Sequence, residues 1–239
     1  MMKRWAIRLL GILASLAIAI GNNSLPAWAA QPLHYTELKF SPLPEIQIPN
    51  YIRYQLPNGL VVYLVEDHEL PLVQGVALVR TGDRLEPADK VGLASLTGNL
   101  IRSGGTMLHK VDELNQLLED RAASIESGIG TTVGNIRFRC LSADLADVLQ
   151  LFAEVMQQPA FAPDRLNLLK NQYKGSIARR NDDPDEIASR EFYKLIYGSA
   201  SPYARTIEYA DLRRITRDDI VAFHRQYFRP DRVLLGIVG

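Results

Sequence analysis

The stretch from Gly92 to Ile101 carries apolar residues on more than one face of a helix. It ends at Ser103-Gly104-Gly105, where a glycine can supply a helix C-cap. A surface helix shows one apolar stripe, whereas a helix that is apolar on several faces is buried. The sequence therefore predicts a buried helix at this position, and any fold of the chain has to enclose it.

Apolar segments with the periods of strands and helices lie on both sides of this stretch. The turn signal Asn58-Gly59 predicts a hairpin formed by the two strands that flank it. The expected segments are strands at 54–56, 60–66 and 73–79, a helix over 111–118, two strands within 122–140 that turn at 128–130, three or four helices that include 145–156, 163–180 and 220–227, and a strand at 233–238. This order predicts an α+β fold, with a mixed, mostly antiparallel sheet and helices packed on one face.

The N-terminus has the three parts of a secretory signal peptide. A basic start at Lys3 and Arg4 is followed by an apolar run from Leu9 to Ile20 and by the small-x-small cleavage site Ala27-Trp28-Ala29. The run is shorter than the ~20 apolar residues that a membrane-spanning helix needs. We therefore expect residues 1–29 to be removed on export to the periplasm or an equivalent extracytoplasmic compartment. Without a Cys near the cleavage site, no membrane anchor is expected after cleavage.

A Pro-rich linker, residues 30–50, and one domain, residues 51–239, are expected to follow the leader. About 190 residues are enough for a single domain with a sizeable core. The apolar run at 233–238 ends directly before the last residue of the sequence. Because domain boundaries usually fall in exposed polar linkers, this ending predicts a domain that is truncated at its last strand.

Charge and cysteine content exclude two classes of protein. Removal of the leader takes away three of the 27 basic residues and none of the 27 acidic ones, so the mature chain carries a formal net charge of −3. A mildly acidic chain without a Lys/Arg cluster is not expected to bind nucleic acid. The single cysteine, Cys140, cannot form an internal disulfide, and the apolar-polar alternation around it predicts a small buried strand residue.

No group of potential metal ligands is evident in the sequence. The four histidines are far apart, at positions 34, 68, 109 and 224. No two of them can share a helical face, as the pair of a zinc site does. His109 and Glu113 are expected to be a solvated pair at the start of a helix. The acidic run around Asp183 predicts a capping box rather than metal ligands, because Asp183 can cap, Pro184 suits the first helical position and Glu186 lies three residues after the cap.

An ordered set of short motifs resembles the pitrilysin/insulinase family of zinc metallopeptidases. The set spans nearly all of residues 54–239 in the order and at the separations typical of that family. Its members are Leu56-Pro57-Asn58-Gly59-Leu60, Gly104-Gly105-Thr106 after the buried helix, Asp182-Asp183-Pro184, Ser201-Pro202-Tyr203, and Phe223-His224 through Pro230. The resemblance implies the N-terminal domain of such a peptidase, with a metalloprotease fold of the LuxS/processing-peptidase type.

Active members of this family carry the motif His-x-x-Glu-His on the buried helix, where the two His bind zinc and the Glu activates water. Aligning the glycines after the helix with the family's Gly-Thr ending puts Ser95, Gly98 and Asn99 at these three positions. The family's third ligand, a Glu on a later helix, corresponds to the region of Gly175 and Ser176. None of these residues can replace the family's ligands or base. The resemblance therefore implies a site without catalytic residues, and we expect the zinc to be lost.

The family also binds extended peptides by adding them to an edge strand of the sheet. The matching strand in this chain contains Glu126, Ser127, Gly128 and Ile129. Main-chain pairing does not depend on particular side chains, so peptide binding can outlast the loss of zinc. An ordinary strand of the sheet is the alternative interpretation.

Three functions are compatible with these observations. The leading hypothesis is a catalytically inactive homologue of an exported zinc peptidase. It would act as the non-catalytic partner subunit in a heterodimer with a zinc-bearing relative, or as the peptide-binding component of the enzyme. The second is an active exported zinc metalloendopeptidase with unconventional ligands. The third is a stand-alone scaffold that binds peptides without an enzyme partner.

Overall fold

The computed structural model describes residues 34–38, 40–43, 45 and 48–239. The chain divides into two units, Met1–Gln47 and Ile48–Gly239, and the second contains every strand described below. The expected signal peptide lies outside the described residues. Within the described ranges, no helix combines the length and the apolar character that crossing a bilayer requires.

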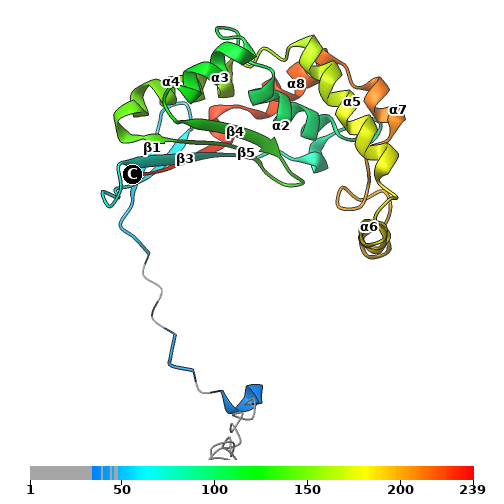
Figure 1. Cartoon of the computed structure of the whole chain (residues 1–239), viewed down its shortest axis with the longest axis horizontal. Coiled ribbons are helices and arrows are strands. Elements are labelled where there is room, and N and C mark those ends of the chain that lie inside the picture. The colour runs from blue at the N-terminus through cyan, green and yellow to red at the C-terminus, as the bar shows by residue number, and fades with distance from the viewer. Residues whose placement is uncertain (1–33, 39, 44, 46–47) are drawn as a thin grey trace, which may run out of the picture. The chain divides into compact units, whose positions relative to one another are not determined.

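A six-stranded sheet forms the base of the second unit (Figure 1), and its strands follow the order β1-β2-β6-β3-β5-β4. The strands are β1 (Ile52–Gln55), β2 (Val61–Val65), β3 (Leu72–Val79), β4 (Ser124–Ile129), β5 (Gly134–Leu141) and β6 (Val233–Val238). Neighbouring strands are antiparallel except for β2 and β6, which are parallel. This confirms the prediction of a mixed, mostly antiparallel sheet. It also makes β6 a central strand and leaves β1 and β4 at the two edges.

Helices cover one face of this sheet. The helices are α2 (Leu93–Ser103), α3 (Val111–Glu119), α4 (Leu145–Gln157), α5 (Pro163–Arg179), α6 (Pro184–Tyr197), α7 (Tyr209–Arg214) and α8 (Arg217–Tyr227). Along β3, Val73, Ala77 and Val79 are buried under the helices, whereas the alternate residues Gln74 and Leu78 are exposed on the other face. Figure 1 shows α2, α4 and α8 on one side of the sheet, while α6 projects away from the helical layer beyond α5.

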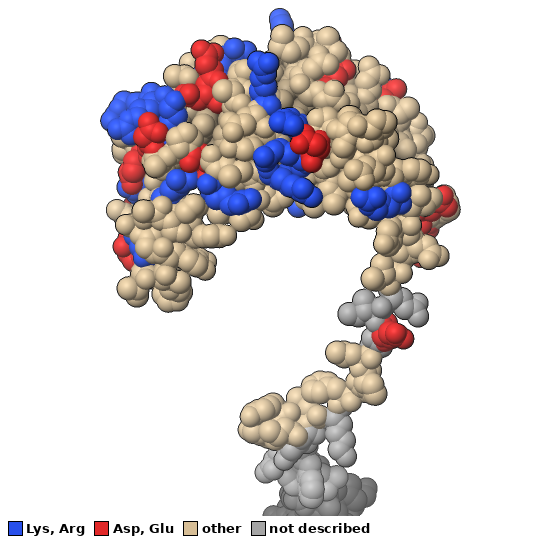
Figure 2. All heavy atoms as spheres, turned by 180° about the vertical axis from the view of Figure 1, so that it is seen from behind, with Lys and Arg blue, Asp and Glu red and all other residues tan. Residues whose placement is uncertain are grey.

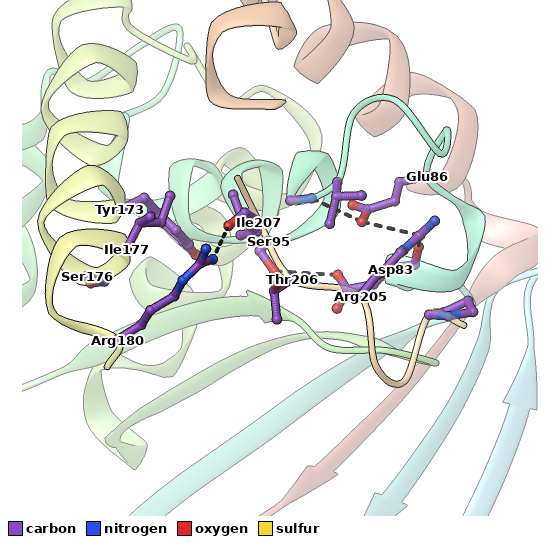
Figure 3. Close-up of a pocket in the computed structure, with 13 residues that line it drawn as sticks. Asp83, Glu86, Ser95, Tyr173, Ser176, Ile177, Arg180, Arg205, Thr206 and Ile207 are labelled. Carbon is purple, nitrogen blue, oxygen red and sulfur yellow. Dashed lines mark hydrogen bonds and ion pairs between the residues drawn. The ribbon is translucent and has the colours of Figure 1, made fainter. Parts of the chain in front are cut away.

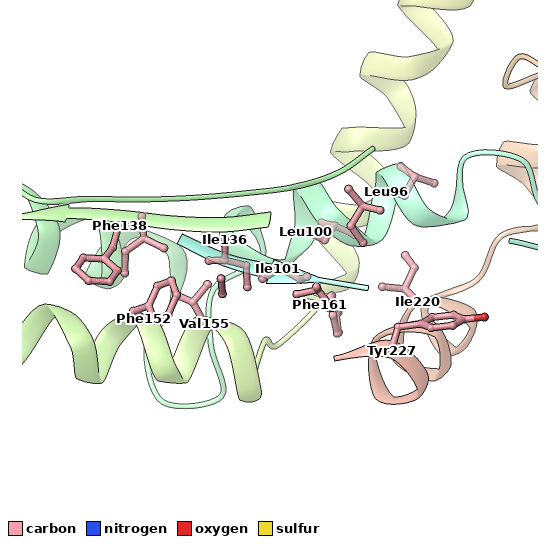
Figure 4. Packing of buried hydrophobic residues seen from close by; sticks show 14 of the residues in the cluster. Leu96, Leu100, Ile101, Ile136, Phe138, Phe152, Val155, Phe161, Ile220 and Tyr227 are labelled. Carbon is pink, nitrogen blue, oxygen red and sulfur yellow. The ribbon is translucent and has the colours of Figure 1, made fainter. Parts of the chain in front are cut away.

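The buried helix expected from the sequence is α2, which lies at the centre of the core. Seven of its eleven residues are buried, among them Leu96 and Leu100. Figure 4 shows α2 between the sheet and the neighbouring helices, with Ile136 of β5 and Ile220 of α8 in the same cluster. Complete burial of such a side chain contributes roughly 1.5–3 kcal/mol to folding. The aliphatic cluster around α2 therefore fixes the position of this helix on the sheet.

Several local predictions are confirmed by the structure. Cys140 is buried in β5, on the face of the sheet that the helices cover. The Asp183 side chain accepts hydrogen bonds from the backbone N–H groups of Asp185 and Glu186, at 2.8 and 3.4 Å, and so caps α6, but the Glu186 side chain does not complete the predicted capping box. The Asn58-Gly59 turn joins β1 and β2 as an antiparallel pair.

Two details of the predicted elements are wrong. The chain forms five helices between β5 and β6, whereas three or four were expected. The short helix α7 has too few residues to show a helical period, and its start is set by a capping box between Glu208 and Asp211. The β4–β5 turn lies later than 128–130, because Gly128 and Ile129 still pair with β5 and the Gly130 N–H bonds to the Val133 carbonyl at 2.9 Å.

The expected solvated pair of His109 and Glu113 is also wrong. The His109 Nδ1 atom lies 2.8 Å from Oε2 of Glu154, a residue of α4 that is buried. A buried carboxylate needs a hydrogen-bond or charge partner, and His109 provides it. This contact joins the loop before α3 to α4, two segments that no sequence pattern connects.

Candidate functional site

The N-terminus of α2 is held by the buried carboxylate of Glu86, which is only 6% exposed. Its oxygens accept hydrogen bonds from the backbone N–H groups of Gly92 and Ala94, both at 3.0 Å. A carboxylate at this position satisfies free N–H groups and complements the positive end of the helix dipole. The Arg205 guanidinium lies 3.3 Å from Glu86 and so ties the loop 198–208 to the same point.

A cavity of about 330 Å³ lies beside this helix start (Figure 3). Its walls come from α2, from α5, from the short turn Asp83–Leu85 and from the loop 198–208. The polar residues that line it include Asp83, Ser95, Tyr173, Ser176, Arg180 and Arg205. Ser95 and Ser176, 81 positions apart in the sequence, thus line one cavity, whereas Gly98 and Asn99 are not among its lining residues.

Each polar side chain at the degenerate motif positions already has a partner in the protein. The Ser95 hydroxyl donates to Oδ1 of Asp83 at 3.4 Å, and the Ser176 hydroxyl donates to the backbone of its own helix. Asn99 donates to the Ser95 carbonyl at 2.8 Å and to the Tyr173 hydroxyl at 3.4 Å. Ser95 and Asn99 therefore link α2 with Asp83 and with Tyr173 of α5, whereas Ser176 bonds only within α5.

The side chains of Ser95, Asn99 and Ser176 are not suitable ligands for a zinc ion. Zinc in proteins is held by thiolate, imidazole and carboxylate ligands, usually four in a structural site and three in a catalytic one. Two hydroxyls and one engaged amide supply none of these groups. In the part of the chain that the structure describes, no cluster of three or more His, Cys, Asp or Glu side chains could hold a metal ion.

Gly98 lies in close contact with the backbone of β4. A Cβ atom at this position would stand 2.4 Å from the Ile129 nitrogen and 2.8 Å from the Gly128 carbonyl carbon. The Ser127 hydroxyl reinforces this contact, because it donates to the Gly98 carbonyl at 2.6 Å and accepts from the Arg102 N–H at 3.2 Å. A glutamate at position 98 would therefore require α2 and β4 to move apart.

Burial dominates the electrostatics of the cavity. It raises the pKa of the Asp83 carboxyl above its usual value, while the hydrogen bond from Ser95 and the charge of Arg205 act in the opposite direction. Burial also raises the pKa of Glu86, against the two backbone hydrogen bonds that it accepts. The pKa of the Tyr173 hydroxyl is raised by burial first and by the Asp83 charge second.

The residues Glu126, Ser127, Gly128 and Ile129 all belong to β4, an edge strand. In an antiparallel pair, residues alternate between those that bond to the partner strand and those that do not. Counted from the Gly130–Val133 bond, Glu126 and Gly128 bond to β5, and the N–H and C=O groups of Ser127 and Ile129 point away from the sheet. No other backbone group of the described residues bonds to these outward groups.

Three residues of this site were not singled out from the sequence. Asp83 and Glu86 lie between β3 and α2, and Arg205 follows Ser201-Pro202-Tyr203, and none of the three belongs to a pattern of its own. Arg205 and Glu86 are 119 positions apart, so only the folded structure brings them together. A charged residue directly after a strand, ahead of a buried helix, was the one available signal.

Residues 61–209 match the family model described as Insulinase (Peptidase family M16). The chain is 25% identical over 193 residues to an uncharacterized zinc protease of Mycobacterium leprae, covering 78% of this chain and 42% of that protein. It is 22% identical over 176 residues to the non-peptidase homolog YmxG of Helicobacter pylori, covering 73% of this chain and 40% of that protein. The chain thus spans less than half the length of these relatives.

Solved structures share the fold. A peptidase M16 inactive domain from Pseudomonas fluorescens superimposes with a TM-score of 0.74 at 28% identity, over 80% of this chain and 46% of that one. The periplasmic protease PqqL from Escherichia coli superimposes with a TM-score of 0.71 at 19% identity, over 82% of this chain and 22% of that one. These matches confirm the α+β fold with its mostly antiparallel sheet.

Proposed function

The chain belongs to the insulinase family, peptidase family M16, and we propose that it is a catalytically inactive member that works by binding. The observation that carries this proposal is the cavity beside α2, which is lined by hydroxyl groups of Ser95 and Ser176, two positions that the resemblance assigns to zinc ligands, while Gly98 is packed against β4. The names of two similar proteins, an M16 inactive domain and a non-peptidase homolog, support it. An active peptidase with unconventional ligands is disfavoured, because the described residues offer no such ligand set.

The first binding activity that we propose is the capture of an extended peptide along β4. The outward N–H and C=O groups of Ser127 and Ile129 can pair with a peptide backbone, as in other cases of strand addition. The neighbouring Ser127 hydroxyl is bonded to α2, which holds the strand in place. Because this pairing uses main-chain groups, methylation of the peptide nitrogens that face β4 should abolish binding. Methylation of the alternate nitrogens, which face away from β4, should not.

The second proposed activity is association with a zinc-bearing relative, for which α6 offers a surface. Phe192, Leu195 and Ile196 lie at i, i+3 and i+4 on this helix and are all exposed, Leu195 to 83%. On another face of the helix, Tyr197 packs against Tyr203 with ring centroids 5.2 Å apart. In Figure 2, viewed from behind, the projecting α6 lobe is mostly uncharged. Apolar patches of this kind mark interaction sites.

The similar proteins are more than twice as long as the region that they share with this chain. This length favours a second domain as the partner that covers the apolar stripe of α6. The region shared with the Pseudomonas protein covers 46% of that protein, so a further stretch of comparable length accompanies the domain there. We propose that a zinc-bearing relative supplies such a domain here, covers the apolar stripe of α6, and performs the hydrolysis. The expected signal peptide supports an exported location for this pair.

A titration tests the pairing. The full chain is added to a zinc-bearing M16 peptidase from the same organism, and peptide hydrolysis is followed together with complex formation by size-exclusion chromatography. Hydrolysis should rise with added chain until the two are equimolar, while the chain alone hydrolyses nothing. Unchanged hydrolysis and no complex at micromolar concentrations would leave the stand-alone scaffold as the better account.

A further inference from the structure

The cavity beside α2 lies next to the proposed peptide-binding edge. The Asp83 and Arg84 N–H groups donate to the carbonyls of Gly130 and Thr131, at 3.0 and 3.3 Å, and so fix one wall of the cavity to the end of β4. Ser95, on another wall, lies one helical turn before Gly98, which touches the backbone of Ile129. A peptide along β4 would therefore carry some of its side chains past the cavity, because alternate side chains of a strand point to the same face.

Three of the four charged residues that line the cavity are held in ion pairs. Glu86 is paired with Arg205, and Arg180 is held by both carboxylate oxygens of Glu208, at 2.8 and 2.9 Å. The fourth charged lining residue, Asp83, forms no ion pair within the described residues, and its carboxylate accepts a bond of 3.4 Å from the Ser95 hydroxyl. Carboxylates of Glu86 and Glu208 occupy the two guanidinium groups of the cavity, so the Asp83 carboxylate has no ion-pair partner of its own, although the charge of Arg205 acts on it.

The rest of the lining suits a long side chain with a cationic end. Val91, Ile177 and Ile207 provide apolar walls, and the hydroxyls of Ser95 and Tyr173 stand near Asp83 as further acceptors. Lysine and arginine place an apolar stem against such walls and their charge at a polar end. An anion fits less well, because both guanidinium groups are already paired with carboxylates.

We propose that this cavity binds a lysine or arginine side chain of a peptide that pairs with β4, and that Asp83 is the residue that selects the basic side chain. The inference rests on the proposed peptide-binding function and adds its specificity. Burial has already removed much of the water around Asp83, as the raised pKa of its carboxyl indicates, so a bound cation replaces lost hydration. The family's catalytic chemistry has no part in it.

The test compares peptides that differ in one charge. Fluorescent decapeptides of β-forming sequence carry one lysine, moved along the sequence position by position, and each has a partner with norleucine instead. Dissociation constants for the full chain are measured by fluorescence anisotropy. For at least one position, the lysine peptide should bind roughly tenfold tighter or more than its norleucine partner, the effect of a charge-assisted hydrogen bond in a partly dry site.

Two variants locate the effect. Asp83→Asn keeps the shape of the side chain and should bind both peptides alike, with the affinity that the wild type has for norleucine. Asp89→Asn, an exposed residue outside the cavity, removes the same charge and should keep the lysine preference. Equal binding of lysine and norleucine peptides by the wild type would overturn the inference while leaving peptide binding intact. If no peptide binds at any position, the proposed function fails as well.

Discussion

Gly98 shows how a single close contact can oppose the introduction of the family's catalytic motif into α2. In active relatives the resemblance puts a glutamate at this position, but here the backbone of β4 occupies the space next to it. Rebuilding the motif by Ser95→His, Gly98→Glu and Asn99→His would thus disturb the contact between α2 and β4. The third ligand would still be missing near Ser176.

We expect Gly98→Ala to destabilise the protein by about 1–2 kcal/mol. The added methyl group would clash with the backbone of β4, and this steric strain exceeds the stabilisation that the higher helix propensity of alanine provides. Gly175→Ala is the matched control. A Cβ at this position of α5 meets no atom closer than 3.9 Å, so this change should stabilise by roughly 0.5–1 kcal/mol. Urea unfolding of both variants measures these values, and a Gly98→Ala variant as stable as Gly175→Ala would contradict the tight contact.

Asp83 gives the site a measurable pH dependence. Its folded-state pKa is raised by burial, with Ser95 and Arg205 opposing. Below a pH of about 3.8 the carboxyl is protonated in both states and contributes nothing. As the pH rises, the unfolded chain ionises first and the folded state loses relative stability. Asp83→Asn should therefore melt at a higher temperature than the wild type at pH 7, and this advantage should shrink toward pH 4. An advantage that does not change with pH, or a lower melting temperature, would contradict this assignment.

At the residue scale, the resemblance to the family pointed to two residues that line the cavity, Ser95 and Ser176. Their positions, and those of Gly98 and Asn99, came from aligning the sequence with the family's motifs. Asp83 and Arg205 could not be located in this way, since the contact between them closes a loop of more than a hundred residues. Their roles depend on how the loop 198–208 folds back over α2.

At the scale of whole elements, periodicity was sufficient for most of the fold. The apolar character of α2 and the alternation along β3 and β5 follow directly from their burial. Chain order does not reveal that β6, the last strand, inserts between β2 and β3, because strand pairing is a long-range property. The short helix α7 was missed for a different reason, since only its caps mark it.

Helix α6 combines an apolar stripe with exposure to solvent. It has no buried residue, although its outward stripe is apolar. Leu195→Asp should weaken association with a zinc-bearing relative by about tenfold or more, because a charge would lie in the middle of the covered surface. Leu168→Asp, at an exposed position of α5, is the matched control and should have no effect. Sedimentation velocity measures both affinities, and equal affinities for the two variants would remove α6 from the interface.

At the scale of the whole molecule, the described residues include an M16 domain with a mostly antiparallel sheet, and β4 forms one edge of that sheet. Around the cavity beside α2, polar contacts join α2, α5 and the loop 198–208. Binding is then the activity that this arrangement supports, through the edge of β4, the cavity beside it and the projecting α6.

The zinc content of the purified chain tests this account most directly. The protein is incubated with an excess of zinc, dialysed against a weak chelator, and its metal is determined by elemental analysis. We expect far less than one zinc per chain, because the side chains of Ser95, Asn99 and Ser176 are poor ligands and are already engaged with other groups of the protein. One tightly held zinc per chain would contradict the proposal that this domain is catalytically inactive.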